Sequence, residues 1–201
     1  NGIGKHSKTK HLNASRDEMH TVERQKDQLS FSKIKFLRKP NLSWLYKKSN
    51  RFDTFGKYAL VVPGGSGKRL NKRIPVEIFF EIVSFLNKKN IKPILIGGKD
   101  DFYVCKKIEE KFPTLQNLCL KTSFFDIASL ATNSLFSIGN DTGPIHIISR
   151  ANKKTIVLFT KNSNPNLCGP VGKLTEVLTF DNTNSFFSKF LIEKLQMLIS
   201  P

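Results

Sequence analysis

Short, almost entirely apolar runs that alternate with longer amphipathic stretches fill the chain from Tyr58 onward. Runs of four or five apolar residues are typical of parallel strands that are buried on both faces. Such runs occupy residues 58–62, 93–96, 135–138 and 155–159. Amphipathic stretches with helical spacing occupy residues 76–88, 101–112, 125–132, 145–151 and 184–199. Strands that alternate with helices predict an α/β fold, a Rossmann-like parallel sheet with helices on both faces.

The loops that follow the predicted strands are the place to look for a binding site. In doubly wound α/β folds, ligands bind outside the carboxyl ends of the strands. The loops after Val62, Ile96 and Ile138 are therefore the candidates, and they are also the most distinctive parts of the sequence.

The charge of the chain favours anionic partners. With 33 Lys and Arg residues against 16 Asp and Glu residues, the formal net charge is +17, which suits phosphates, nucleic acid or an acidic membrane surface. The positive charge is densest in residues 1–57, where we expect one helix, within residues 13–29, and a basic linker. The composition changes near Tyr58, so residues 58–201 are predicted to form the folded domain.

Targeting and cysteine patterns are those of a protein of the cytoplasm. No apolar run approaches the roughly 20 residues that a membrane-spanning helix needs, and the opening residues lack the apolar core of a signal peptide. Cys105, Cys119 and Cys168 form neither an even set nor a Cys-x-x-Cys pair, which predicts reduced thiols. The chain opens at Asn1 with no initiator methionine, as expected of a fragment of a longer protein.

The loop after the first predicted strand is Pro63-Gly-Gly-Ser-Gly-Lys-Arg69. Its glycines let backbone N–H groups approach a phosphate, and Ser66 adds a hydroxyl donor beside Gly65. The segment is not a P-loop, because two residues instead of four separate the outer glycines and Arg69 stands where Ser or Thr would follow the lysine. A plain glycine turn between a strand and a helix explains the segment equally well.

Two cations stand immediately before the next predicted helix, in Asn71-Lys-Arg-Ile-Pro75. Pro75 suits the first helical position, where its missing N–H is not needed. Lys72 and Arg73 oppose the helix macrodipole there, so a bound anion would explain their presence. Two solvated basic residues in a Lys-rich protein are the simpler interpretation.

The most informative segment is Ile138-Gly-Asn-Asp-Thr-Gly-Pro-Ile-His146, which runs from a strand end directly into a helix. Asp141 or Thr142 can cap this helix, and the N–H groups around Gly143 offer an anion site. His146, on the first turn, can donate a hydrogen bond to the same anion. Each residue alone has an ordinary structural explanation, but together at a strand-to-helix junction they favour a functional site.

Six motifs, in this order, resemble those of the ADP-heptose:lipopolysaccharide heptosyltransferases, glycosyltransferase family 9. They are P-G-G-S after a strand, N-K-R-I-P before a helix, I-L-I-G-G-K-D-D, K-T-S-F-F-D-I-A-S-L, I-G-N-D-T-G-P-I-H and L-F-T-K-N-S-N-P-N-L-C-G-P. The last motif, taken alone, is explained by its turn-forming residues. The resemblance covers about residues 58–180, and residues 19–24 more weakly resemble the segment that closes the N-terminal domain in that family.

The resemblance implies a GT-B architecture, in which two Rossmann-like domains face each other and the donor binds mainly to the C-terminal one. This chain would be that C-terminal half, preceded by the interdomain segment. The donor diphosphate contacts that the resemblance implies are Lys72, Asp141, Thr142, Gly143 and His146. It also implies that Asp101, or its neighbour Asp100, approaches the donor ribose; Ile74 replaces the tryptophan usual after the motif's cations. The family's general base is an aspartate of the N-terminal domain, so no catalytic residue is expected in this chain.

The implied function is metal-independent, inverting transfer of heptose or a related sugar from a nucleotide-diphosphate sugar, such as ADP-heptose, to a lipopolysaccharide core or other glycan. No cofactor and no metal is implied. The implied partners include the missing N-terminal domain, and the charge suits peripheral contact with an anionic surface at the inner face of the inner membrane. Two alternatives stay open. One is a basic nucleic-acid-binding module, although no recognised nucleic-acid motif is present and no specific nucleic acid is expected. The other is a non-catalytic nucleotide-binding relic or split-gene product.

Overall fold

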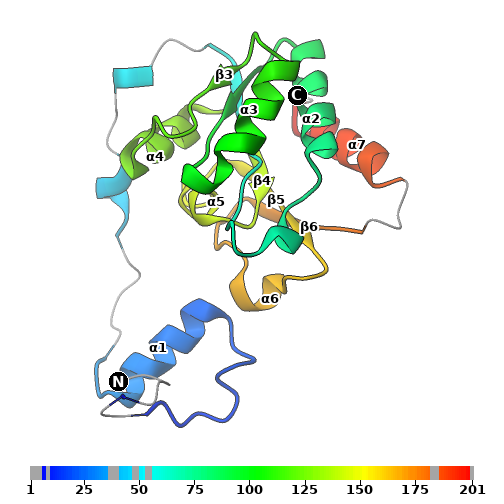
Figure 1. Ribbon diagram of the computed structural model, residues 1–201. Coiled ribbons are helices and arrows are strands. Elements are labelled where there is room, and N and C mark those ends of the chain that lie inside the picture. Colours follow the sequence, from blue (N-terminus) through cyan, green and yellow to red (C-terminus); the bar gives the residue numbers. More distant parts are fainter. Residues whose placement is uncertain are drawn as a thin grey trace. The chain divides into compact units, whose positions relative to one another are not determined.

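The computed structural model of the protein describes residues 6–7, 10–35, 41–46, 50–52, 56–181 and 186–199. The chain divides into two compact units (Figure 1). One comprises Asn1–Asn41 together with Asn164–Gly169, and the other comprises Leu42–Ser163 together with Pro170–Pro201. The candidate site described below lies in the second unit.

The second unit is built on a single sheet of six strands in the order β3-β2-β1-β4-β5-β6. The strands are β1 (Tyr58–Val62), β2 (Lys92–Leu95), β3 (Gln116–Asn117), β4 (Phe136–Asn140), β5 (Lys154–Thr160) and β6 (Thr175–Phe180). Every neighbouring pair is parallel. The carboxyl ends of all six strands therefore lie at one edge of the sheet.

Helices cover both faces of this sheet (Figure 1). They are α2 (Val76–Lys88), α3 (Phe102–Lys111), α4 (Phe124–Asn133), α5 (Gly143–Ile148) and α7 (Phe187–Ile199). Helices α2, α3 and α7 pack together on one face and share one apolar core with the strands. Helices α4 and α5 pack against each other, and the Tyr58 hydroxyl donates a hydrogen bond of 2.8 Å to the Leu130 carbonyl of α4. Short 3₁₀ turns lie at Ser43–Tyr46, Asn50–Phe52, Leu70–Lys72 and Lys99–Asp101.

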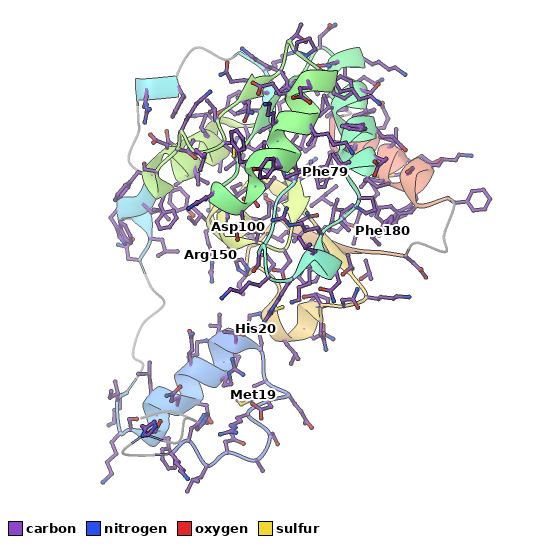
Figure 2. All side chains as sticks on the ribbon, viewed as in Figure 1. Met19, His20, Phe79, Asp100, Arg150 and Phe180 are labelled. Atoms are coloured by element: carbon purple, nitrogen blue, oxygen red, sulfur yellow. The ribbon has the colours of Figure 1, made fainter. Side chains whose placement is uncertain are left out.

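The apolar spacing of α2 explains why it docks on the sheet. Phe79, Ile82, Val83 and Leu86 follow one another at intervals of three, one and three residues, so they share one helical face, and none of them is exposed to solvent. Figure 2 labels Phe79 among the densely packed side chains of this unit. Burial of four such side chains contributes roughly 1.5–3 kcal/mol each.

A capping box starts α4 at the point where its first turn borders the candidate site. The Ser123 hydroxyl accepts a hydrogen bond from the Asp126 backbone N–H at 3.2 Å, and the Asp126 carboxylate accepts one from the Ser123 N–H at 2.9 Å. Reciprocal capping of this kind satisfies two backbone donors that the helix itself leaves free. The position of Phe124, the first residue of α4, is fixed by this cap.

The predicted Rossmann-like sheet is confirmed. The four predicted strands correspond within two residues to β1, β2, β4 and β5, and the five predicted helices correspond to α2, α3, α4, α5 and α7. Strands β3 and β6 are not in the prediction. Strand β3 has only two residues, and β6 is an edge strand in which exposed and buried residues alternate, so neither forms a continuous apolar run. Residue 184, where the last helix is predicted to begin, lies outside the described residues.

The first unit contains one long helix, α1 (Thr21–Phe31), and the short α6 (Pro165–Cys168). The predicted helix within residues 13–29 exists but starts later, because His20 is its N-cap: the His20 Nδ1 accepts a hydrogen bond from the Val22 N–H at 3.2 Å. Residues 14–18 form turns instead. The His20 Nε2 also lies 3.0 Å from the Gly169 carbonyl oxygen, and the Thr21 hydroxyl donates to the Leu167 carbonyl at 2.9 Å, which binds the 164–169 segment to this unit.

Side-chain hydrogen bonds also hold the start of the first unit to α1. Asn13 Nδ2 donates to the Asp27 carboxylate at 2.8 Å, and the buried His11 lies 2.5 Å from the same oxygen. The hydrogen bond from Asn13 is the main reason that the pKa of the Asp27 carboxyl lies below its usual value, and the hydrogen bond from His11 is the second. The arm that precedes α1 is thereby attached to the middle of the helix.

The predictions about thiols and membrane spans can be compared with the described residues. All three cysteines are free, and Cys105 and Cys119 are buried beneath Gly97. Burial raises the pKa of both of these thiols, which keeps them protonated. Among the described helices, none combines the length and the apolar character needed to cross a bilayer.

Candidate functional site

The strand order places a crevice at the carboxyl ends of β1, β2 and β4. Strand β1 lies between β2 and β4, so the chain runs outward from β1 first to one side and then to the other. Such a switch point is where doubly wound sheets bind ligands. A cavity of about 400 Å³ lies there. Its lining residues are Gly65, Ser66, Gly97, Gly98, Lys99, Asp100, Asp101, Thr122, Phe124, Ile127, Thr142 and Pro144.

Four of the predicted site residues line this cavity: Gly65, Ser66, Asp101 and Thr142. They come from the loops after β1, β2 and β4. Phe124 and Ile127, at the start of α4, give the cavity an apolar wall, and the glycines Gly65, Gly97 and Gly98 are also among its lining residues. A cavity with one apolar wall and a few convergent polar groups suits a flat ring with polar substituents.

Asp101 links two glycine-rich loops, the one that follows β1 and the one that follows β2, by hydrogen bonds. Its Oδ1 accepts a hydrogen bond from the Gly65 N–H at 2.7 Å, and its Oδ2 accepts one from the Gly98 N–H at 2.8 Å. The residue is only 4% exposed. A Cβ on Gly64 would stand 2.0 Å from the Asp101 carboxylate, so this approach requires a glycine. Both carboxylate oxygens of Asp101 are therefore engaged by the protein's own backbone, and the predicted approach of Asp101 to a ribose stays a prediction.

Arg73 contacts Asp101 and the same two glycine-rich loops. Its Nη2 lies 3.6 Å from Asp101 Oδ1 and donates hydrogen bonds to the Gly65 carbonyl and, at 2.9 Å, to the Asp100 carbonyl. The neighbouring Asp100 is exposed, and its Oδ2 accepts from the Gly67 N–H at 2.8 Å. Of the two adjacent carboxylates, Asp100 is thus the one that reaches solvent at the cavity.

Asn140 is a site residue that the sequence analysis missed. Its Nδ2 donates to the Pro63 carbonyl at 2.8 Å and to the Gly64 carbonyl at 2.9 Å, and the residue is 1% exposed. These bonds hold the loop after β1 against the end of β4. The available signal was a polar residue at the end of an otherwise apolar strand, which must find buried partners.

A chain of polar side chains runs along the same edge of the sheet, beside the cavity. Lys72 Nζ donates to Ser163 Oγ at 2.8 Å, and Ser163 Oγ donates to Asp141 Oδ2 at 3.3 Å. His146 Nε2 lies 3.4 Å from Asp141 Oδ1. Three predicted site residues, Lys72, Asp141 and His146, are thereby brought together, and the link between them is Ser163. The sequence analysis explained the loop that contains Ser163 by turn formation alone.

The start of α5 differs in detail from the prediction. Thr142 is the N-cap residue, but its side chain makes no capping hydrogen bond, and Asp141 points to Ser163 and His146. Gly143 is exposed, and a Cβ added there meets nothing within 4 Å. There is therefore free space beside Gly143 at the start of α5. The His146 side chain is 45% exposed and so is accessible to a ligand.

Family membership follows from the sequence pattern as a whole. The pattern that defines glycosyltransferase family 9 (heptosyltransferase) matches residues 8–189, which is most of the chain. The chain belongs to glycosyltransferase family 9. No curated protein sequence shows significant similarity to it. The resemblance on which the site was predicted is therefore confirmed at the level of the family.

Solved structures of this glycosyltransferase family share the fold. Escherichia coli ADP-heptose lipopolysaccharide heptosyltransferase II superposes with a TM-score of 0.66 at 18% identity, over 80% of this chain and 52% of that one. E. coli heptosyltransferase WaaC with ADP gives 0.68 at 21% identity, over 90% and 57%. The family 9 glycosyltransferase of Veillonella parvula gives 0.65 at 20% identity, over 92% and 56%. The chain thus spans slightly more than half the length of each of these proteins.

Proposed function

We propose that this family 9 chain is the donor-binding half of a metal-independent, inverting glycosyltransferase of the GT-B type. In this proposal it binds a nucleotide-diphosphate sugar, and heptose or a related sugar is transferred to a lipopolysaccharide-core-type acceptor. The observation that carries the proposal is the position of Lys72, Asp141 and His146 beside the cavity at the switch point of the sheet. Structural relatives that contain ADP and ADP-2-deoxy-2-fluoro heptose support this choice of ligand.

In this proposal the cavity binds the nucleoside of the donor, and the polar side chains beside it bind the diphosphate. The nucleoside occupies the 400 Å³ cavity, with its base against the apolar wall of Phe124 and Ile127. The diphosphate lies toward Lys72 and the exposed Gly143 at the start of α5, where the lysine supplies a cation and there is space for the ligand. Ser66 is exposed at the cavity, and its hydroxyl adds a further donor.

In the proposed reaction these residues act on the leaving group. A base deprotonates the acceptor hydroxyl, the resulting oxygen attacks the anomeric carbon, and the bond from that carbon to the diphosphate oxygen breaks. Negative charge collects on the departing diphosphate, where Lys72 and His146 stabilise it. The general base and the acceptor-facing surface are supplied by the other half of the GT-B architecture. We also propose that the protein acts in the cytoplasm, at the inner face of the inner membrane.

Replacing Lys72 with glutamine tests the donor assignment. The variant should bind ADP roughly ten- to a hundredfold more weakly, because a charge-assisted hydrogen bond contributes about 1.5–3 kcal/mol. Adenosine should bind as before, and AMP should show an intermediate loss. Isothermal titration calorimetry with the three ligands measures these differences. Lys173→Gln is the matched control, because Lys173 is an exposed lysine that does not line the donor cavity. Equal losses for all three ligands would contradict the assignment of Lys72 to the diphosphate.

Asp141 and His146 should act as a pair in the binding of the diphosphate. Each single change, Asp141→Ala or His146→Ala, is expected to lower ADP affinity about tenfold, since a lost charged hydrogen bond costs about 1.5 kcal/mol. The carboxylate acts by orienting the imidazole from 3.4 Å, so the double variant should lose little more than either single variant. ADP titrations and thermal melts of all three variants measure this. Full additivity would refute the orienting role, and unchanged affinity with unchanged melting would refute the site.

A further inference from the structure

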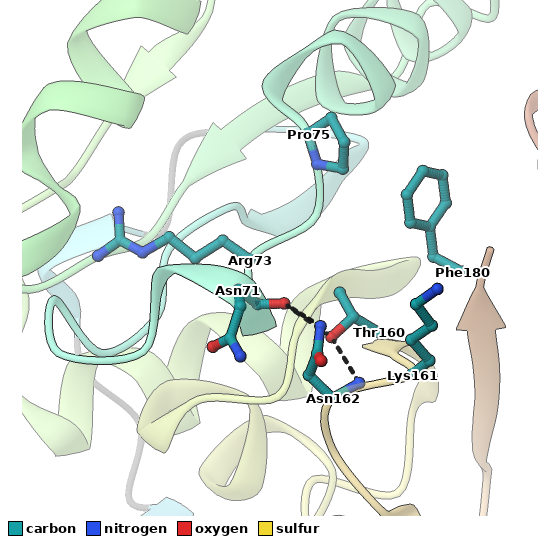
Figure 3. A pocket seen from close by; sticks show the side chains of 7 residues that line it. All are labelled: Asn71, Arg73, Pro75, Thr160, Lys161, Asn162 and Phe180. Atoms are coloured by element: carbon teal, nitrogen blue, oxygen red, sulfur yellow. Dashed lines mark hydrogen bonds between the residues drawn. The ribbon is translucent and has the colours of Figure 1, made fainter. Parts of the chain in front are cut away.

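The end of the sheet where the strands finish carries the donor cavity and a second cavity of about 260 Å³ (Figure 3). The second cavity borders the donor site at Arg73, and its far side is formed by Phe180, the last residue of β6. Hydrogen bonds of 3.0 Å from Thr160 and Asn162 to the Asn71 carbonyl hold the loops that line it. Neither cavity is lined by residues of the opposite end of the sheet, where the strands begin. The proposed donor site therefore makes no use of that end.

The end where the strands begin is called the amino edge below, and it consists of the described segments in which the chain enters the six strands. They are residues 56–57, 88–92, 112–115, 134–135, 149–154 and 170–174. These described segments contain seven lysines, one arginine and no aspartate or glutamate. The cations are Lys57, Lys88, Lys89, Lys92, Arg150, Lys153, Lys154 and Lys173. They equal almost half of the formal net charge of +17.

The strand register places several of these cations in one row. Lys92, the first residue of β2, is paired with Tyr58, and its N–H donates to the Lys57 carbonyl at 2.9 Å. On the other side of β1, the N–H of Leu135 donates to the Tyr58 carbonyl at 2.9 Å, and Lys154 begins β5, the strand beyond β4. Neighbouring strands lie about 4.8 Å apart, so the row extends over roughly 14 Å.

Two aliphatic side chains are exposed among these cations. Leu135 is 44% exposed and Leu174 is 47% exposed, and each directly precedes a strand. The Leu174 carbonyl accepts a hydrogen bond of 3.0 Å from the Thr155 N–H, so it lies beside the start of β5. The described residues of the amino edge include no exposed aromatic ring. Aliphatic side chains among lysines suit the headgroup region of a bilayer, whereas single-stranded nucleic acids are bound by stacking on aromatic rings.

The carboxylates closest in sequence to the amino edge, among the described residues, are paired with lysines outside it. Glu110 lies 3.9 Å from Lys106 on the same helix, and Glu176 lies 2.6 Å from Lys194 of α7. These carboxylates therefore do little to reduce the positive potential of the amino edge, which attracts anionic surfaces.

We propose that the amino edge of the sheet binds the surface of a bilayer that contains anionic lipids. The lysine ammonium groups pair with the lipid phosphates, and Leu135 and Leu174 enter the headgroup region. The long, flexible stem of lysine lets each charge reach a phosphate while its methylene groups stay near the lipid. The inference deepens the membrane location named in the proposed function and rests on that part of it alone. Because the donor cavity lies at the other end of the strands, nucleotide and lipid bind without competition.

Co-sedimentation of the 201-residue chain with lipid vesicles tests the proposal. Vesicles that mix phosphatidylethanolamine with phosphatidylglycerol are anionic, and vesicles of phosphatidylcholine are neutral. The chain should bind the anionic vesicles far more tightly, and added salt should release it, because salt screens exposed charges. The triple variant Lys57→Gln, Lys89→Gln and Lys154→Gln should bind them about a hundredfold more weakly, since each lysine near an anionic surface contributes roughly a fivefold factor.

The matched control is the triple variant Lys106→Gln, Lys107→Gln and Lys189→Gln. It removes the same charge from exposed lysines of α3 and α7 and should bind the anionic vesicles within about fivefold of the original chain.

Leu135→Ala combined with Leu174→Ala tests the aliphatic contact. This variant should lose vesicle affinity several-fold and keep the same weak affinity for a single-stranded RNA oligonucleotide, because only the bilayer receives the two side chains.

Three results would overturn the proposal. They are equal binding to the two kinds of vesicle, equal losses in the two triple variants, and tighter binding to the RNA than to the anionic vesicles. ADP titrations separate this inference from the donor assignment, because the Lys57, Lys89 and Lys154 variant should bind ADP as the original chain does. Absence of vesicle binding with intact ADP binding would refute the lipid surface alone. Absence of ADP binding with lysine-dependent vesicle binding would refute the donor site alone.

Discussion

Asp101→Asn is expected to lower the free energy of unfolding by about 3–5 kcal/mol, the usual cost of removing one partner from a buried charged contact. The side chain keeps its shape in this variant, but one carboxylate oxygen becomes an NH₂ group. That group then faces the N–H of Gly65 or of Gly98, which are both donors now bound at 2.7 and 2.8 Å. The Arg73 guanidinium, 3.6 Å away, loses its counter-charge at the same time. The two glycine loops should separate, and the donor cavity should lose its shape.

Urea unfolding of the variant and of Asp100→Asn measures this effect with a matched control. Asp100 is exposed and accepts a single hydrogen bond, from Gly67 at 2.8 Å, so its change should cost less than about 1 kcal/mol. The comparison also tests the predicted contact of Asp101 with the donor ribose. If Asp101 served mainly as a ligand contact, Asp101→Asn would keep its stability and lose nucleotide affinity instead.

Gly139→Ala should destabilise the domain by about 3 kcal/mol, at the upper end of the usual range for overpacked sites. An added Cβ at Gly139 would stand 2.5 Å from both the Cβ and the carbonyl oxygen of Val62. Gly139 is paired with Val62 in the register of β1 and β4, the two central strands, so neither backbone can shift without disturbing the sheet. For a chain of this size, the expected fall in Tm is about 6–12 °C.

Gly143→Ala is the control for this second change. No atom lies within 4 Å of a Cβ added at Gly143, so its stability should stay within about 0.5 kcal/mol of the original. Thermal melts of the two variants, measured side by side, give the comparison. Equal melting temperatures for Gly139→Ala and Gly143→Ala would show that β1 and β4 can move apart without cost.

Continuous apolar runs explain why the central part of the fold was predictable. Strands β1, β4 and β5 are covered by helices on both faces, so almost every residue in them is buried and the pattern is clear in the sequence. Strand β6 lies at the edge with Glu176 and Thr179 exposed, so it lacks the continuous apolar run from which the buried strands were predicted. The prediction failed where burial is partial.

The site was predictable in its location but not in its internal contacts. Strand-end loops meet at one edge of any parallel sheet, so Gly65, Thr142 and Lys72 could be placed together from order alone. The contact of Lys72 with Ser163 joins residues 91 positions apart, and nothing in the spacing of either motif encodes it. Likewise, burial of the Asp101 carboxylate by two backbone N–H groups is a property of the folded loops and not of the G-G-K-D-D segment.

The order of the strands has a consequence for how the polypeptide folds as it leaves the ribosome. β2 adds beside β1 and β3 beside β2, and then β4, β5 and β6 extend the sheet from the other side of β1, so each new strand finds a neighbour already made. A nascent chain that has emerged as far as β3 can therefore hold three paired strands covered by α2 and α3. The free edge of β1 stays open until Phe136–Asn140 emerges, and unpaired edges invite aggregation. While the segment between β3 and β4 is synthesised, the nascent protein thus carries an unpaired edge on β1, a central strand of the finished sheet.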